Sequence, residues 1–153
     1  MKIDLVIGSL QPGGAEKQLC GLAERLHSRG EDVCVVPLFD NGPLASRLMS
    51  VGVPVTSLAT RPRDRVQSHR GLRASVVGWR LTEHWLRRRP AAVQVWLPEA
   101  QIIALPVARL TGISTRVMAI RSMANAVSLS RVARMGLLVA AKCSTAVVAN
   151  SDA

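Results

Sequence analysis

Two adjacent glycines, Gly13 and Gly14, stand where a short apolar run gives way to a helical stretch, and such a position can bind an anion. Glycine lets the backbone approach a ligand closely, and the N–H groups and dipole of a helix N-terminus favour negative charge. The loop is not a Walker A loop, because Gly14 occupies the place of the lysine, and it lacks the GxGxxG pattern. A plain tight turn explains the same local pattern, so both interpretations stay open.

Further polar residues follow other apolar runs. Glu99 comes just after Val93–Trp96, where a carboxylate can act as a general base or can simply favour the N-terminus of the next helix. Arg121 and Ser122 follow the run 116–120, and an arginine there can pair with an acceptor phosphate or carboxylate. Asn150 and Ser151 follow the run 145–149 in the same way. We therefore take Glu99 as the catalytic candidate and expect the other residues, with Gly13 and Gly14, to contribute to substrate binding.

An arginine-rich region extends from residue 61 to residue 89 and holds two acidic residues, Asp64 and Glu83. Trp79 and Trp85 lie among its basic residues on a predicted helix, an arrangement that suits an anionic membrane surface. The alternative is a solvated face with both Trp side chains partly buried. The arginines expected to face the membrane are Arg61, Arg63, Arg65, Arg70, Arg73, Arg80, Arg87 and Arg88.

The chain carries a net charge of +10, which favours an anionic partner. Nucleic acid is a poor candidate, because three Trp, one Phe and no Tyr leave few side chains for stacking on bases. The cysteines are Cys20, Cys34 and Cys143. They show no metal-ligand spacing, so we expect buried apolar residues in a reducing compartment and no metal site. His69 and His84 are expected to be solvated.

Strand-like and helical segments alternate along the chain. The predicted strands are Ile3–Ile7, Val33–Leu38, Val53–Leu58, Val93–Trp96, Arg116–Ile120 and Thr145–Ala149. Helices are predicted after Gly14, over 44–51 with Leu44, Leu48 and Val51 on the inner side, and over 72–88, 99–110 and 124–142. This alternation predicts one α/β domain over residues 1–153 with a doubly wound, mostly parallel, Rossmann-like sheet. Ligands bind beyond the carboxyl ends of such strands, where the polar residues above would gather.

No run reaches the roughly 18 apolar residues of a membrane span, and no targeting segment is predicted. A soluble or peripherally membrane-bound protein is therefore expected. The sequence stops just after its last predicted strand, where a covering helix would normally follow, and this suggests an incomplete fold.

Blocks across essentially the whole chain resemble glycosyltransferase family 4. Gly13–Glu16 before an amphipathic helix, followed by Leu26–Gly30 and a strand, is similar to the family opening GGAE…LA..L..RGH.V.V. Weaker similarity continues through Gly52–Val55 and Ala108–Ile113. The ending Val147–Ala153 is similar to the family's VVANSE.

The resemblance implies the N-terminal, acceptor-side half of a GT-B enzyme of the hexosyltransferase type, usually without a bound metal or cofactor. The C-terminal half of such enzymes mainly holds the nucleotide-sugar and carries an E-x7-E pair. Glu16 and Glu24 have that spacing, but they lie on the first helix of the other half and about 80° apart beyond two full turns, so we do not regard them as catalytic. Many members have a His after the fourth strand, where this chain offers Trp96 or Glu99.

We therefore expect the acceptor-binding half of a nucleotide-sugar-dependent glycosyltransferase, acting in cell-surface polysaccharide or glycolipid assembly. Its partners would be a sugar or lipid-linked acceptor, the inner face of the cytoplasmic membrane and a C-terminal GT-B domain in cis or in trans. Alone it would be inactive, because the donor clamp is missing. The alternative is a stand-alone, non-catalytic binding module completed by a partner chain. A dinucleotide enzyme is a third hypothesis, with Asp40 as its only acidic residue at the end of the second strand.

Overall fold

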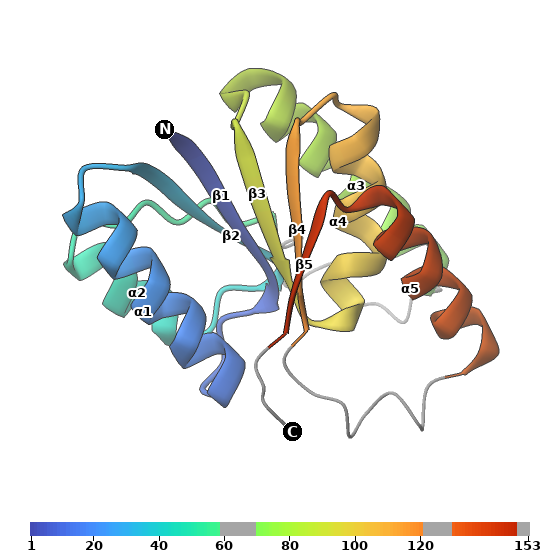
Figure 1. Ribbon diagram of the computed structural model, residues 1–153. Coiled ribbons are helices and arrows are strands. Elements are labelled where there is room, and N and C mark those ends of the chain that lie inside the picture. The colour runs from blue at the N-terminus through green and yellow to red at the C-terminus, as the bar shows by residue number, and fades with distance from the viewer. Residues whose placement is uncertain (59–69, 121–129, 150–153) are drawn as a thin grey trace.

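The computed structural model describes residues 1–58, 70–120 and 130–149, and for residues 70–73 it describes the backbone only. Five parallel strands form one sheet in the order β2-β1-β3-β4-β5 (Figure 1). They are β1 (Lys2–Ser9), β2 (Asp32–Asp40), β3 (Ala92–Trp96), β4 (Thr115–Ile120) and β5 (Ala146–Ala149). The central strands are apolar on both faces, as a parallel sheet covered on both sides requires. The predicted α/β, Rossmann-like fold class is confirmed.

Helices cover both faces of the sheet (Figure 1). The helices are α1 (Gly14–Ser28), α2 (Leu44–Ser50), α3 (Arg70–Arg88), α4 (Pro98–Leu110) and α5 (Arg131–Cys143). Residues of α1 and α2 share one core cluster with the sheet, and residues of α3, α4 and α5 share the other. Gly136 lets α5 approach α4, because a Cβ there would lie 3.0 Å from the side chain of Ile102. None of the described helices combines the length and apolar character needed to cross a bilayer.

The segment 53–58 does not form the full strand that the sequence predicts, so this prediction is wrong. Within 53–58, Val55 makes a single bridge to Val35, beside β2. Pro54 and Pro37 lack the N–H groups that a regular ladder between these segments would need. Val51 is also exposed rather than on the inner side of its helix, since it follows the last residue of α2.

The inner face of α1 carries Leu19 and Ala23, which are fully buried, and Leu22 and Leu26, which pack partly buried against the same core cluster. All three cysteines are buried and free, as predicted. Burial raises the pKa of Cys20 and of Cys34 above that of an ordinary thiol. These thiols are therefore packing residues with little thiolate character.

Candidate functional site

The centre of the sheet contains a topological switch point between β1 and β3. The chain leaves β1 through α1 toward β2, whereas β3, on the other side of β1, leads into α4 on the opposite face. In open α/β sheets, ligands bind in the crevice that forms outside the carboxyl ends of two such strands. The loop after β1 and the first turn of α4 lie at this end of the sheet, so the two segments define the candidate site (Figure 1).

Glu99 and Gly8 pack against each other at this switch point. A Cβ on Gly8 would lie 2.7 Å from Oε1 of Glu99 and 3.1 Å from its Cγ, so this approach requires glycine. Glu99 is exposed in the first turn of α4, and its carboxylate makes no hydrogen bond or ion pair with another described residue. The structure therefore presents an uncommitted carboxylate at the edge where a ligand is expected.

Leu97 positions Glu99 through a strained backbone. Its φ of 68° and ψ of 145° lie in a region that usually requires glycine, and such strain costs about 1–3 kcal/mol. The turn is held because the carbonyl of Leu97 accepts hydrogen bonds from the amides of Ala100 and Gln101. Pro98 then begins α4, a position that suits proline. Strain of this kind tends to persist at functional sites, and no residue pattern indicates the positive φ of Leu97.

Gln101 fixes the adjacent strand ends. Its buried side-chain Nε2 donates to the carbonyl of Ala119 at 2.8 Å and to that of Val95 at 3.3 Å. The amide therefore ties the ends of β3 and β4 to α4, two residues after Glu99 in the same helix. Only its polar type at a sheet-facing helical position could have indicated this role from the sequence.

The glycines of the first loop occupy the start of α1, as predicted. Gly13 is the extended N-cap, and a Cβ there would overlap the carboxylate of Glu16, which folds back over the loop. Gly14 faces open space. Because Glu16 already places negative charge at this helix N-terminus, the loop is better suited to a hydroxyl-rich ligand than to an anion.

The loop after β1 is tied to the loop after β2. The Leu10 amide donates to the Asp40 carbonyl at 3.2 Å, and Gln11 Nε2 donates to Asp40 Oδ2 at 2.6 Å. Gly42, at φ 58°, lies so close to the Leu10 backbone that no side chain would fit. Asp40 is thus engaged in fixing the loops, which disfavours its role in a dinucleotide site.

Four predicted site residues lie outside the described part of the chain. Arg121 and Ser122 follow β4, and Asn150 and Ser151 follow β5. Their contribution to substrate binding stays a prediction.

Trp96, the other residue near the position of the family's His, is buried in the core and cannot reach a ligand. Glu99 is therefore the residue of this pair that can take part in chemistry.

The basic region divides into exposed and buried side chains. Arg61, Arg63 and Arg65, with the side chains of Arg70 and Arg73, lie outside the described residues. Arg87 and Trp79 are exposed, Trp79 by 73%, whereas Trp85 is buried. Arg80 is partly buried and donates to the carbonyl of Leu58 at 3.4 Å.

The predictions that Arg88 faces a membrane and that His84 is solvated are wrong. The Arg88 side chain is only 19% exposed and donates through Nε to Oδ1 of the fully buried Asp4 at 2.6 Å, so it does not face a membrane. His84 is not solvated, because its Nε2 lies 2.9 Å from Oδ2 of Asp4. Trp85 Nε1 donates to the same oxygen at 3.0 Å. Arg88 also bonds to Asp32, and this hydrogen bond lowers the pKa of the Asp32 carboxyl.

The same cluster offers a possible set of metal ligands, since atoms of Asp4, Cys34 and His84 lie within 4.8 Å of one another. Both oxygens of Asp4 are already hydrogen-bonded, and Arg88 adds a positive charge beside them. The Cys34 thiol has a raised pKa and donates to Thr56. These groups suit a structural anchor for α3 better than a cation site.

Comparison with known proteins identifies solved structures of similar fold. No protein-family model matches the sequence, and no curated protein matches it. Among solved structures, Anabaena HepE in complex with UDP is similar over 99% of this chain and 38% of its own, with 19% identity and a TM-score of 0.72. Acinetobacter baumannii MurG is similar over 99% of this chain and 41% of its own, with 11% identity and a TM-score of 0.71.

The UDP-GlcNAc 2-epimerase of Methanocaldococcus jannaschii is similar over 99% of this chain and 40% of its own, with 11% identity and a TM-score of 0.68. The chain thus spans 38–41% of the length of these proteins. Its fold is that of one half of a GT-B protein. Because these proteins include an epimerase, the fold does not by itself define the reaction.

Proposed function

We propose that this chain is the acceptor-binding, N-terminal half of a nucleotide-sugar-dependent glycosyltransferase that acts in cell-surface polysaccharide or glycolipid assembly. The observation that carries the proposal is the exposed Glu99 carboxylate, which packs on Gly8 at the switch point behind the strained Leu97. The Gly13–Gly14 loop on the other side of the crevice supports a hydroxyl-rich ligand. The family resemblance of the sequence points to the same half of the enzyme.

In the proposed reaction, Glu99 acts as a general base. An acceptor hydroxyl bound between the two loops gives its proton to Glu99 while its oxygen forms a bond to the anomeric carbon of the donor sugar. The bond from that carbon to the nucleoside diphosphate breaks, and the diphosphate leaves with the bonding electrons. A C-terminal GT-B half, in cis or in trans, would hold the donor, so this chain alone would not turn over.

Replacing Glu99 with Gln in the transferase that contains both halves tests this role. Removal of a general base lowers kcat by about 10²–10⁴-fold, and we expect a small change in the KM for the acceptor. Glu83→Gln is the control, since Glu83 is exposed on α3 and away from the switch point. Full kcat in the Glu99→Gln variant would leave Glu99 with only its effect on the helix N-terminus.

A wild-type protein with both halves that binds acceptor but transfers no sugar would favour the alternative, a non-catalytic binding module. Equilibrium binding of acceptor to the 153-residue chain, measured beside the transfer assay, separates the two functions. The binding module requires acceptor affinity without turnover, whereas the transferase requires both once the C-terminal half is supplied.

We also propose that the outer face of α3 docks on an anionic membrane. Trp79 and Leu86 are exposed there together with Arg87, so apolar and cationic side chains share one surface. Trp79→Ser should reduce co-sedimentation with phosphatidylglycerol vesicles at low salt, whereas Leu110→Ser, at the exposed end of α4, should not. Equal binding by both variants and the wild type would contradict this docking surface.

A further inference from the structure

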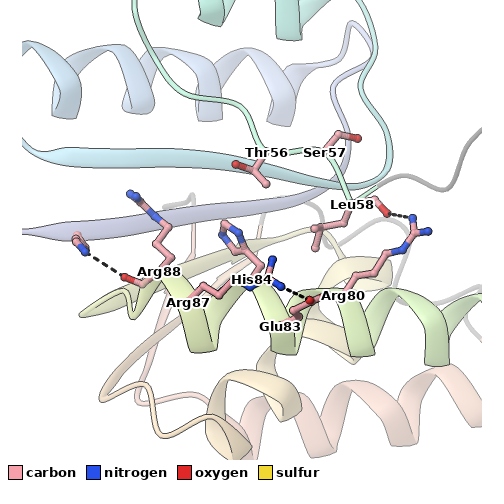
Figure 2. Close-up of a pocket in the computed structure, with 9 residues that line it drawn as sticks. Thr56, Ser57, Leu58, Arg80, Glu83, His84, Arg87 and Arg88 are labelled. Carbon is pink, nitrogen blue, oxygen red and sulfur yellow. Dashed lines mark hydrogen bonds and ion pairs between the residues drawn. The ribbon is translucent and has the colours of Figure 1, made fainter.

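A groove with a volume of about 610 Å³ lies between α3 and residues 56–58, away from the switch point. Figure 2 shows Arg80, His84 and Arg88 rising from α3 toward the segment that carries Thr56. These three basic residues are spaced at i, i+4 and i+8, so they share one helix face. Lys2, at the start of β1, lines the groove at the Arg88 end.

Cationic side chains predominate among the residues that line the groove. Four cationic side chains line it, Lys2, Arg80, Arg87 and Arg88, and Glu83 is the single carboxylate among the lining residues. Asp4 and Asp32 compensate Arg88 from behind. The ammonium of Lys2 bonds to the carbonyl of Arg88 and makes no ion pair with a carboxylate of the described chain. The lining therefore favours an anionic ligand over a cationic one.

The ion pair between Arg87 and Glu83 is weakly held. Both side chains are exposed and lie one helical turn apart, and such surface pairs contribute little to stability. An anion in the groove can thus attract Arg87 without breaking a strong interaction. Arg88, by contrast, is held in place by ion pairs with Asp4 and Asp32. It therefore lines the groove in a fixed position.

His84 connects the buried cluster to the groove. Its Nε2 faces Asp4 at 2.9 Å, and within the described chain its Nδ1 has no hydrogen-bond partner. When both ring nitrogens carry protons, the imidazolium donates to Asp4 on one side and can donate to an anion on the other. The hydroxyl of Thr56, which accepts a bond from Cys34, lines the facing wall.

We propose that this groove binds a phosphoryl group, carried either by a soluble phosphate ester or by a lipid headgroup. A phosphoryl dianion offers several oxygens, so Lys2, Arg80 and His84 can bind it from different sides. The site is separate from the crevice beside Glu99. It does not depend on sugar transfer, because phosphoryl binding requires neither a donor nor a C-terminal half.

Titration of the 153-residue chain with inorganic pyrophosphate, followed by amide NMR shifts, tests the soluble form of the ligand. We expect shifts centred on α3 and residues 56–58, and an affinity about tenfold lower in Lys2→Met and in Arg80→Met. Lys142→Met, an exposed lysine on α5, is the matched control and should bind like the wild type. Circular dichroism of each variant verifies that the fold is retained.

Co-sedimentation with phosphatidylcholine vesicles, with and without phosphatidic acid, tests the lipid form with the same variants. Binding that requires phosphatidic acid and falls in Lys2→Met and Arg80→Met, but not in Lys142→Met, supports a headgroup ligand. Binding of pyrophosphate with the same pattern supports a soluble one. If neither probe binds, or if the control loses as much affinity as the groove variants, the proposal is overturned, whatever the outcome of the transfer assay.

Discussion

At the scale of single residues, the contact between Gly8 and Glu99 is the tightest feature of the candidate crevice. Gly8→Ala should push the Glu99 side chain aside while leaving the fold intact, because the atoms in the way belong to a flexible, exposed side chain. We expect a change in unfolding free energy within about 1 kcal/mol, together with a clear fall in kcat of the complete transferase.

The matched control for this substitution is Gly21→Ala. Gly21 lies in α1, and a Cβ there meets no atom within 4 Å, so both stability and kcat should be kept or improved. Unchanged kcat in Gly8→Ala would mean that the position of Glu99 does not matter for the reaction. Thermal unfolding and steady-state kinetics on the same preparations provide both readouts.

Residue types alone could predict Glu99 but not its surroundings. Its place after an apolar run identified it, since strand ends meet at one edge of a parallel sheet. The specific roles of Gly8, Leu97 and Gln101 could not be predicted, because a close packing contact, a positive φ and a buried amide depend on the three-dimensional arrangement of β1, β3 and α4. The environment of Glu99 therefore needed the structure.

At the scale of elements, α3 is anchored to the sheet by one buried carboxylate. Asp4 accepts hydrogen bonds from Trp85 and Arg88 and faces His84, all in the last turns of α3. Asp4→Asn removes the negative charge and leaves Arg88 poorly compensated. We expect a loss of roughly 3 kcal/mol of unfolding free energy, at the lower end for a broken buried ion pair.

Urea unfolding of Asp4→Asn beside Glu83→Gln measures this anchor. The exposed pair of Glu83 with Arg87 should contribute less than about 0.5 kcal/mol, so the control should unfold like the wild type. Similar midpoints for the two variants would show that the buried cluster does not hold α3.

The sequence predicted the extent of α3 well but not the roles of its faces. Arginines spaced along a helix next to Trp suggested a solvated or membrane-facing surface, and Arg87 is indeed exposed. Arg88 and His84 are turned inward because Asp4 lies in the middle of an apolar strand and must be paired. Likewise, residues 53–58 have a strand composition, yet the prolines at 37 and 54 limit their pairing with β2.

At the scale of the whole molecule, the sheet ends in an open edge. All four residues of β5 are exposed, and the described chain places no strand beyond it. Apolar side chains gather on the neighbouring α5, where Met135 and Leu138 are 68% and 65% exposed. An unpaired edge strand beside an apolar helix face favours association with another protein surface.

This surface predicts that the isolated 153-residue chain self-associates. Leu138→Lys places a charge in the middle of the apolar face of α5 and should shift the chain toward monomer in sedimentation velocity experiments. Leu110→Lys changes another exposed leucine, at the end of α4 and outside this face, and should leave association unchanged. A wild-type chain that is monomeric over the accessible concentrations would contradict the prediction, because it would show that the open edge and the face of α5 are tolerated in water. Association that Leu110→Lys and Leu138→Lys reduce equally would point instead to a general effect of added charge.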